Sequence, residues 1–407
     1  MATKSKSHKC ELLAPAGNRE MLVAAIDAGC DSVYFGVKSF NMRVNAGNFS
    51  VSELPDVVKY CHAHKVKAYL TLNSIIYDNE LAELDTVLKA AKSAKIDAII
   101  CWDMSVLRLA QKYKLDVHLS TQASVSNFEA VEYYAKLGVK RIILARELSL
   151  SQIKSITDQI IKRKLNVSIE TFVHGAMCVA VSGRCFTSQF LFKRSANRGD
   201  CLQPCRRAYK VTDMETGGEV KLDNNYVMSA KDLCALPFID KLKDAGISAF
   251  KIEGRCRSPE YVKVVISAYR KAIDNALSEV QKKELIAKLK SVYNRKFSSG
   301  FYLGLPTNDD FTDIYGSAAT YVKEYIGYVC NFYSKINVAE VNIESNGLKV
   351  GDHLMIIGPT TGVKEQKLSS IEINHHKIKS AKKGRHIAVK LNFLARINDK
   401  VFVIRKA

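Results

Sequence analysis

Short apolar runs alternate with longer amphipathic segments along the first two thirds of this chain, and this alternation limits the possible folds more than any other feature. It begins with ELLAP, which precedes NREMLVAAIDAG, and ends with AFKIEG, which precedes PEYVKVVISAYRKAIDNAL. Near-continuous apolar runs of this length are typical of parallel strands that are covered by helices on both faces. The eight runs begin at about Glu11, Ser32, Lys67, Ala98, Asp116, Arg141, Asn166 and Ala249.

Eight strand–helix units predict an α/β fold, a (β/α)8 TIM-type barrel within residues 1–295. The alternative is a doubly wound open sheet, but no glycine-rich dinucleotide fingerprint follows the first run. In a barrel, the loops after the strands form the active face, so the polar residues of these loops would meet there. Any one of them alone could be a helix cap or a turn residue. Their expected convergence on one face favours a functional site over these structural roles. They are Asn18, Arg43, Asn45, Asn73, Asp103, Gln122, Arg146, Glu147, Glu170, His174, Glu253 and Arg255.

A cysteine-rich insertion, about residues 170–235, follows the seventh predicted strand and shows neither helical nor strand periodicity. Its cysteines are Cys178, Cys185, Cys201, Cys205 and Cys234. In a reduced chain, thiolates gathered in this way suggest zinc or an iron–sulfur cluster, whereas ordinary buried cysteines are the alternative. Only Cys201 and Cys205 approach the close pairing of a zinc knuckle, so the spacing favours a cluster over zinc.

The chain is strongly basic, with 61 Lys and Arg residues against 41 Asp and Glu residues. This excess suggests a nucleic-acid partner, and a generally basic proteome is the alternative. After a predicted connector at 296–320, residues 321–407 read as a small antiparallel β-barrel of about six strands, with 15 Lys and Arg against seven Asp and Glu. No apolar run is long enough to span a bilayer and no signal-peptide core is present, so we expect a cytoplasmic protein.

The segment ETFVHGAMCVAVSGRCFTS resembles the signature of peptidase family U32, E-x-F-x-x-G-[SA]-x-C-x4-G-x-C-x-x-S. The matching residues are Glu170, Phe172, Gly175, Cys178, Gly183, Cys185 and Ser188. The likeness extends over the barrel, and residues 321–407 resemble the C-terminal domain of the tRNA-acting branch of the family. Members similar to this chain are linked to oxygen-independent hydroxylation, which at the tRNA wobble position forms 5-hydroxyuridine with prephenate as the implied hydroxyl source.

The resemblance implies a [4Fe–4S] cluster on Cys178, Cys185 and Cys201, with Cys234 preferred as the fourth ligand and Cys205 as the alternative. Such a cluster could transfer electrons or bind substrate at an open iron site, and four cysteines favour electron transfer. Arg184, Arg198, Arg206 and Arg255 are candidates for binding carboxylates or phosphates. Glu170 occupies a motif position, and His174 is a candidate base, substrate ligand or structural histidine.

The sequence therefore predicts a tRNA hydroxylase that uses prephenate and binds an anticodon loop, with a second protein of the same family as a further expected partner. The family name implies a collagenase-like peptidase as the alternative, and a hydroxylase of another RNA or of a small aromatic compound is a further one. The chain has no HExxH or GxSxG motif and no Cys–His pair in a recognisable protease setting, which favours the hydroxylase.

Overall fold

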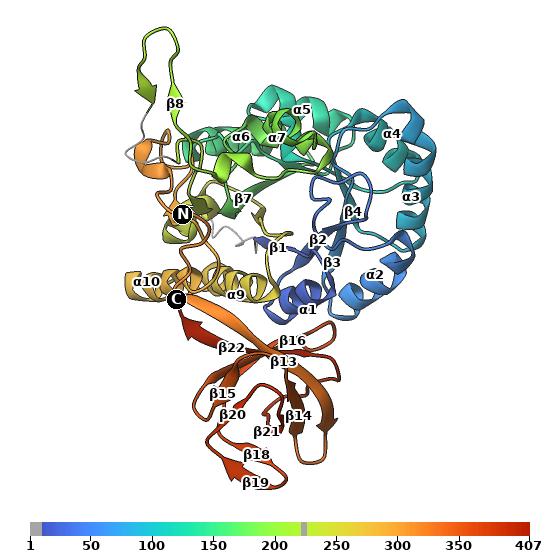
Figure 1. Ribbon diagram of the computed structural model, residues 1–407. Helices are drawn as coiled ribbons and strands as arrows, with labels where there is room; N and C mark the ends of the chain where they lie inside the picture. The colour runs from blue at the N-terminus through green and yellow to red at the C-terminus, as the bar shows by residue number, and fades with distance from the viewer. Residues whose placement is uncertain (1–9, 221–225) are drawn as a thin grey trace, which may run out of the picture.

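Eight parallel strands close into a barrel in the computed structural model, which describes residues 10–220 and 226–407 (Figure 1). The barrel strands are β1 (Glu11–Pro15), β2 (Ser32–Gly36), β3 (Lys67–Thr71), β4 (Ala98–Cys101), β5 (Val117–Leu119), β6 (Arg141–Ile143), β7 (Ser168–Ala176) and β11 (Ala249–Ile252). Each pairs with the next in parallel, and β11 pairs with both β1 and β7, which closes the ring. The predicted TIM-type barrel is therefore confirmed, and closure excludes the open doubly wound sheet. The fifth and seventh strands begin one and two residues later than predicted.

Helices surround the ring of strands on its outer side (Figure 1). They are α1 (Arg19–Asp27), α2 (Leu54–Ala63), α3 (Leu81–Ser93), α4 (Met104–Lys112), α5 (Phe128–Lys136), α6 (Leu150–Arg163), α8 (Ile239–Asp244), α9 (Pro259–Asp274) and α10 (Glu279–Lys290). Two of the polar residues expected at the active face are helix caps instead. The Asn18 side chain accepts a hydrogen bond from Met21 N, and the Asp103 side chain accepts one from Ser105 N. Both satisfy the unpaired N–H groups at a helix start.

The strands pack tightly because their apolar residues are buried on both faces. All five residues of β2 and all four of β4 are buried. Large tyrosines fill the space between strands and helices, and their hydroxyls find backbone partners: Tyr269 donates to Val173 O at 2.8 Å and Tyr302 to Phe172 O at 2.6 Å. These bonds fix β7, the strand from which the cysteine-rich insertion emerges.

The insertion contains little regular structure. It includes α7 (Thr187–Phe192) and a hairpin of β8 (Val211–Thr212) and β9 (Glu219–Val220), which projects away from the barrel (Figure 1). Strand β10 (Asp232–Cys234) then pairs antiparallel with the end of β7, and β12 (Phe297–Ser298) pairs with β10. The connector expected at 296–320 is thus tied back to the barrel at its first residues.

The C-terminal region is antiparallel, as predicted, but contains more strands than the six expected. They are β13 (Tyr321–Tyr333), β14 (Val338–Ile343), β15 (Gly347–Lys349), β16 (His353–Gly358), β17 (Gly362–Lys367), β18 (Ile371–Ile373), β19 (His376–Ile378), β20 (Ser380–Lys382), β21 (His386–Lys390) and β22 (Lys400–Lys406). Eight form one sheet in the order β17-β16-β22-β13-β14-β21-β18-β19, and β15 pairs with β20. Sequence patterning underestimates the number because several strands are only three residues long and carry exposed polar side chains.

The C-terminal sheet packs against α1 and α9 on the outside of the barrel (Figure 1). Met355, Ile357 and Val363 form a small apolar cluster with Ala24 of α1. Salt bridges surround this cluster, including Lys364–Asp27 at 2.6 Å, Lys323–Glu260 at 2.8 Å and Lys263–Glu365 at 3.1 Å. In the described ranges, no helix is long and apolar enough to cross a membrane.

Candidate active site

Where the barrel strands end, one carboxylate lies among three guanidinium groups. Glu253 follows β11, and its Oε2 lies 3.4 Å from Arg43 Nη2 and 3.8 Å from Arg146 Nη2. Burial alone would raise the pKa of Glu253, but the positive charges of the neighbouring arginines outweigh burial and lower it. Arg255 is the third of these arginines. We call the site formed by Arg43, Arg146, Glu253 and Arg255 the mouth.

Arg255, a predicted site residue, is held in one orientation by its neighbours. Its Nη1 donates to Thr71 Oγ1 at 2.8 Å, and its Nη2 donates to Asn48 Oδ1 at 2.8 Å. Burial lowers its pKa to about 10, and within the described part of the chain its Nε has no hydrogen-bond partner. Gly36 leaves room for it, because a Cβ there would lie 2.6 Å from Nη2. This buried guanidinium therefore has one donor left for a further acceptor, such as a water, an ion or a ligand.

A buried lysine lies beneath the mouth. Lys251 Nζ is 3.3 Å from Glu170 Oε1, 4.3 Å from the centre of the Tyr34 ring and 5.4 Å from that of Phe172. Burial lowers the pKa of Lys251, while the Glu170 carboxylate opposes this shift. Lys251 therefore adds positive charge directly below the arginines.

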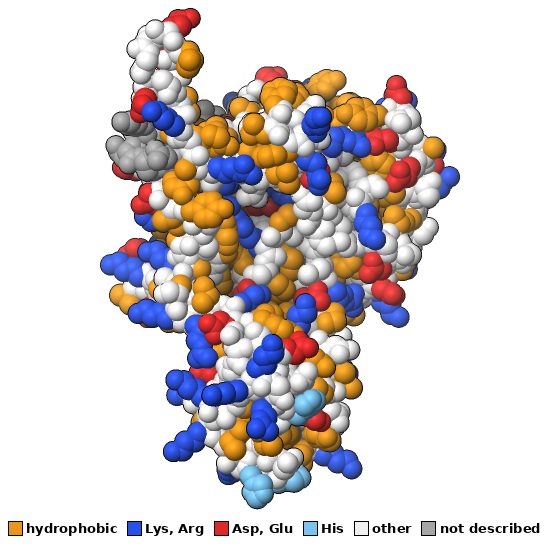
Figure 2. Space-filling model, viewed as in Figure 1, with side chains coloured by type: hydrophobic (Ala, Val, Ile, Leu, Met, Phe, Trp, Pro, Cys, Tyr) orange, Lys and Arg blue, Asp and Glu red, His pale blue; other side chains and the backbone are white. Residues whose placement is uncertain are grey.

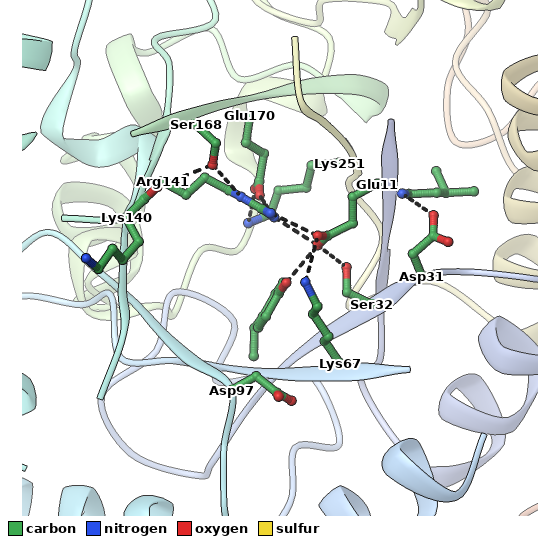
Figure 3. Close-up of polar contacts among 12 residues, drawn as sticks. Glu11, Asp31, Ser32, Lys67, Asp97, Lys140, Arg141, Ser168, Glu170 and Lys251 are labelled. Atoms are coloured by element: carbon green, nitrogen blue, oxygen red, sulfur yellow. Dashed lines mark hydrogen bonds and ion pairs between the residues drawn. The ribbon is translucent and has the colours of Figure 1, made fainter. Parts of the chain in front are cut away.

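Glu170, another predicted site residue, belongs to a network of polar contacts inside the barrel (Figure 3). Arg141 Nη1 lies 3.3 Å from Glu170 Oε2, and the two Nη atoms of Arg141 donate to the Glu11 carboxylate at 2.8 and 2.9 Å. Ser32 and Tyr69 also donate to Glu11, at 2.7 and 2.8 Å. Glu11 and Arg141 are the first residues of their strands, so this network forms the floor of the barrel, opposite the mouth. Glu170 is fully buried, and Lys251 lies between it and the mouth.

Positive charge exceeds negative charge at the mouth and in the barrel below it. The cations are Arg43, Arg141, Arg146, Lys251 and Arg255, and the carboxylates are Glu11, Glu170 and Glu253. In a partly dehydrated site this excess attracts an anion much more strongly than it would in water. Figure 2 shows a hollow in the face of the barrel with Lys and Arg side chains around it. The mouth is therefore suited to a ligand with two negative charges.

Residues 177–209, which we call the cysteine segment, cross the mouth and contact loops that follow four different strands. The contacts are Asn45 Nδ2 to Asp200 Oδ1 at 3.1 Å, Arg198 Nη1 to Glu80 Oε2 at 2.8 Å, Arg184 Nη2 to Ser124 Oγ at 3.0 Å and Ser182 N to Glu147 Oε1 at 3.5 Å. Gly199 permits the closest of these approaches, because a Cβ there would lie 2.2 Å from Asn41 O. The segment therefore forms a cover over the barrel.

The cysteine segment carries four thiols, those of Cys178, Cys185, Cys201 and Cys205. Their positions are set by three contacts: the guanidinium of Arg206 donates to Met177 O, the Cys185 N–H donates to Asn197 Oδ1 at 2.9 Å, and Ser188 Oγ lies 3.9 Å from Cys201 Sγ. Burial is the main cause that raises the pKa of Cys205, and Cys178, Cys201 and Cys185 raise it further, so all three lie within electrostatic reach. Cys201 also has a small effect on the pKa of Arg43, after those of Glu253, burial, Cys256 and Tyr34.

Cys234, the preferred fourth ligand, lies on β10 outside the cysteine segment. It pairs with His174 in the β7–β10 ladder, four residues before Cys178 in the chain. Its thiol is buried and lies 3.8 Å from the Tyr269 hydroxyl. Across residues 10–220 and 226–407, no three His, Cys, Asp or Glu side chains are placed to hold a single metal ion. A cluster is larger than one ion, and soft thiolate donors are the ligands it requires.

His174 lies behind the barrel wall rather than at the mouth. Its ring packs against Tyr261 and Tyr269 of α9 and against Phe297. Burial lowers its pKa to about 3, so the ring is neutral. A register shift between β7 and β11 explains this placement, because it interrupts the alternation by which residues two apart share a face. Arg184, by contrast, is exposed on the cysteine segment.

The sequence points to Arg43, Arg146, Glu253 and Arg255 as neighbours, and the structure brings them together. It does not point to Lys251 or Tyr34, which come from strand interiors. One signal is present: Lys251 interrupts the otherwise apolar run AFKI, and a lysine in a buried strand needs a local partner.

Comparisons with known proteins place this chain among related sequences. The model of Peptidase family U32 matches residues 17–312. An uncharacterised protease of Methanocaldococcus jannaschii is 44% identical over 403 residues, covering 97% of this chain and 98% of that protein. A collagenase of Porphyromonas gingivalis is 42% identical, covering 96% and 97% of the two chains. The tRNA hydroxylation protein P1 of Bacillus subtilis is 35% identical over 364 residues, covering 86% and 84%.

Proposed function

Because this chain belongs to peptidase family U32, in which RNA-hydroxylating and protease-named proteins share one barrel, we propose that it is an oxygen-independent tRNA hydroxylase. In this proposal it forms 5-hydroxyuridine at the wobble position and takes the hydroxyl group from prephenate. The excess of positive charge at the mouth, beneath the cysteine segment that contacts the loops around it, is the observation that carries the proposal.

Prephenate is a dicarboxylate, and its two negative charges match the charge excess at the mouth. Arg255 offers a free Nε to a carboxylate, and its other donors are fixed by Thr71 and Asn48. Arg43 and Arg146 offer the second cationic position, since Glu253 neutralises only one of them. Planar guanidinium groups bind carboxylates through two parallel hydrogen bonds, which would orient the donor as well as attract it.

The donor set of the cysteine segment fits an iron–sulfur cluster. Cys178, Cys185 and Cys201 would hold it, and we take Cys205 as the fourth ligand because it belongs to the same segment and lies within electrostatic reach of the other three, although the sequence resemblance favours Cys234. When bound, such a cluster supplies electron transfer, or a Lewis-acidic iron if one position is open. The segment itself limits the entry of water to the mouth, and its basic residues attract the RNA backbone.

The net charge of the chain supports an RNA substrate. The formal charge is +20, and residues 321–407 add an exposed basic surface beside the barrel (Figure 2). An unpaired uridine of an anticodon loop can leave its stack and enter the mouth, because single-stranded loops expose their base edges.

The protease and collagenase names of two relatives support a peptidase as the second candidate. A Ser or Cys peptidase needs a histidine or comparable base beside its nucleophile. The two histidines of the barrel interior and wall are neutral and buried: His118 packs against Tyr69 at the floor, and His174 faces α9. This arrangement favours the hydroxylase.

One experiment decides between the two functions. We expect that deleting the gene removes 5-hydroxyuridine and its derivatives from digested total tRNA, and that a copy with Cys178→Ala fails to restore them, whereas the wild-type copy succeeds. Mass spectrometry of the nucleosides measures both. An unchanged nucleoside profile, together with cleavage of gelatin by both the wild-type protein and the variant, would establish the peptidase instead.

A second experiment identifies the fourth thiol. Protein purified without oxygen should be brown and contain about four irons per chain. Cys205→Ala should lose iron to the same extent as Cys178→Ala, and Cys234→Ala should keep it, because Cys234 is buried on β10. Loss of iron in Cys234→Ala alone would show that β10 shifts when the cluster binds.

A further inference from the structure

Two phenylalanines on the outer surface of the cysteine segment are exposed in a way that packing does not explain. Phe190 is 80% exposed and Phe186 is 58% exposed. Their rings stack, with centroids 5.9 Å apart and an interplanar angle of 20°. The two residues are four apart in sequence and lie on one face of α7 and the turn before it. Burying such rings would stabilise the fold, so a pair left in solvent indicates a binding surface.

The opposite side of α7 faces the thiols. Ser188 is buried, its Oγ lies 3.9 Å from Cys201 Sγ, and it accepts a hydrogen bond from Leu202 N at 3.1 Å. The helix therefore carries the exposed rings on one side and contacts the Cys201 thiol on the other. The distance between the two sides is about one helix diameter, roughly 10 Å.

The surroundings of the rings are cationic. Between Met177 and Tyr209 the chain has six Lys and Arg residues and one acidic residue, Asp200, which is already paired with Arg194. Lys193 is exposed directly after α7, and the Arg207 guanidinium lies 4.9 Å from the Phe192 ring. Hydrophobic and basic side chains are interleaved on the surface over α7 (Figure 2). An apolar protein partner would not require this charge, whereas an RNA strand would.

We propose that Phe186 and Phe190 form a nucleobase-stacking platform, on which an unpaired base next to the target base rests while Lys193 and Arg207 contact the flanking phosphates. This inference rests on the proposed function and adds the surface that holds the RNA. Stacking on an aromatic face accepts every base, so the platform supplies affinity and position, and the mouth selects the base to be modified.

The test compares two double variants of the full chain. The first, the Leu pair, combines Phe186→Leu with Phe190→Leu, which keeps an apolar surface but removes the aromatic faces. The second, the Tyr pair, combines Phe186→Tyr with Phe190→Tyr, which keeps both. The probe is a short RNA hairpin with an unpaired, uridine-containing loop, and a fully paired RNA duplex of the same length is the control. We expect the Leu pair to lower hairpin affinity about tenfold or more, and the Tyr pair to leave it near wild type. Duplex affinity and the slope of affinity against salt should stay unchanged in both, since stacking releases no counterions.

Three results would overturn the platform. One is a Leu pair that binds the hairpin as tightly as the wild type, and another is an equal loss of duplex binding. The third is a Leu pair whose oligomeric state in the absence of RNA differs from that of the wild type while its RNA affinity is unchanged. That result would assign the surface to a protein contact. Failure of the proposed function looks different, because the wild-type chain would then bind the hairpin and leave its uridine unmodified. Phe190→Trp provides a direct signal, since stacking of a base on the new indole should quench its fluorescence.

Discussion

The substitution Glu11→Gln tests whether the polar floor of the barrel stabilises the fold rather than taking part in chemistry. Glu11 receives hydrogen bonds from Arg141, Ser32 and Tyr69 in a site where its side chain is 13% exposed. Burial raises the pKa of Glu11, but the hydrogen bonds and charge of Arg141 outweigh this and lower it to about 2 from 4.5. A shift of this size corresponds to about 3 kcal/mol in favour of folding.

The pH dependence follows from the direction of the shift. A carboxyl group whose pKa is lower in the folded state stabilises the fold above its unfolded pKa, and this stability is lost as pH falls toward the folded pKa. The difference in unfolding free energy between wild type and Glu11→Gln should therefore be about 3 kcal/mol near pH 7. It should shrink to less than half of that near pH 3.

Urea unfolding, followed by circular dichroism at several pH values, measures this difference. Glu279→Gln is the matched control, because its side chain is 79% exposed and its substitution should change stability by less than about 0.5 kcal/mol. We expect Glu11→Gln to retain RNA hydroxylation at temperatures where it remains folded. The reasoning is refuted if the stability difference is the same at both ends of the pH range, or if activity is lost while stability is unchanged.

Three further predictions concern the mouth, the barrel wall and the RNA surface. His174→Gln should retain near-neutral hydroxylation activity, because the ring faces α9; loss of activity in a protein that melts normally would assign it to the chemistry. Arg255→Lys should raise the KM for the proposed donor prephenate about tenfold or more with a smaller effect on kcat, since a single ammonium group cannot keep the contacts to Thr71 and Asn48 and also replace the free Nε–H of the guanidinium. A fall in kcat as large as the rise in KM would place Arg255 in the chemical step. Replacing the exposed Lys382, Lys383 and Arg385 by Gln should weaken tRNA binding and lower the salt slope by about one for each phosphate that is no longer neutralised, as filter binding at several salt concentrations would show. An unchanged slope would mean that the C-terminal sheet does not bind the RNA.

The barrel was predictable because its strands are apolar on both faces. Runs such as Ser32–Gly36 and Ala98–Cys101 have no solvent-facing position, so their sequence alone requires a covered parallel sheet. The convergence of Arg43, Glu253 and Arg255 could also be predicted from the sequence, because closure of the barrel brings the loops after the strands together.

Other parts of the site are set by features that strand periodicity does not reveal. One irregular step in the β7–β11 ladder turns His174 toward α9, and no residue type at that position signals the shift. Cys234 follows the other thiols in the chain, which suggests that it joins them, yet the antiparallel β10 carries it back along β7. Both outcomes depend on pairing between strands, which a single sequence does not specify.

The position of the cysteine segment within the chain has a consequence for synthesis. Strand β7 needs β6 and β11 as neighbours, but the whole segment is translated between β7 and β11. When its thiols leave the ribosome, Ala249–Ile252 has not yet been made and the ring is still open. The thiols are thus accessible to solvent before the cavity that the segment covers exists. The last strand to be added both completes the barrel and brings Glu253 and Arg255 beneath a segment that was made before them.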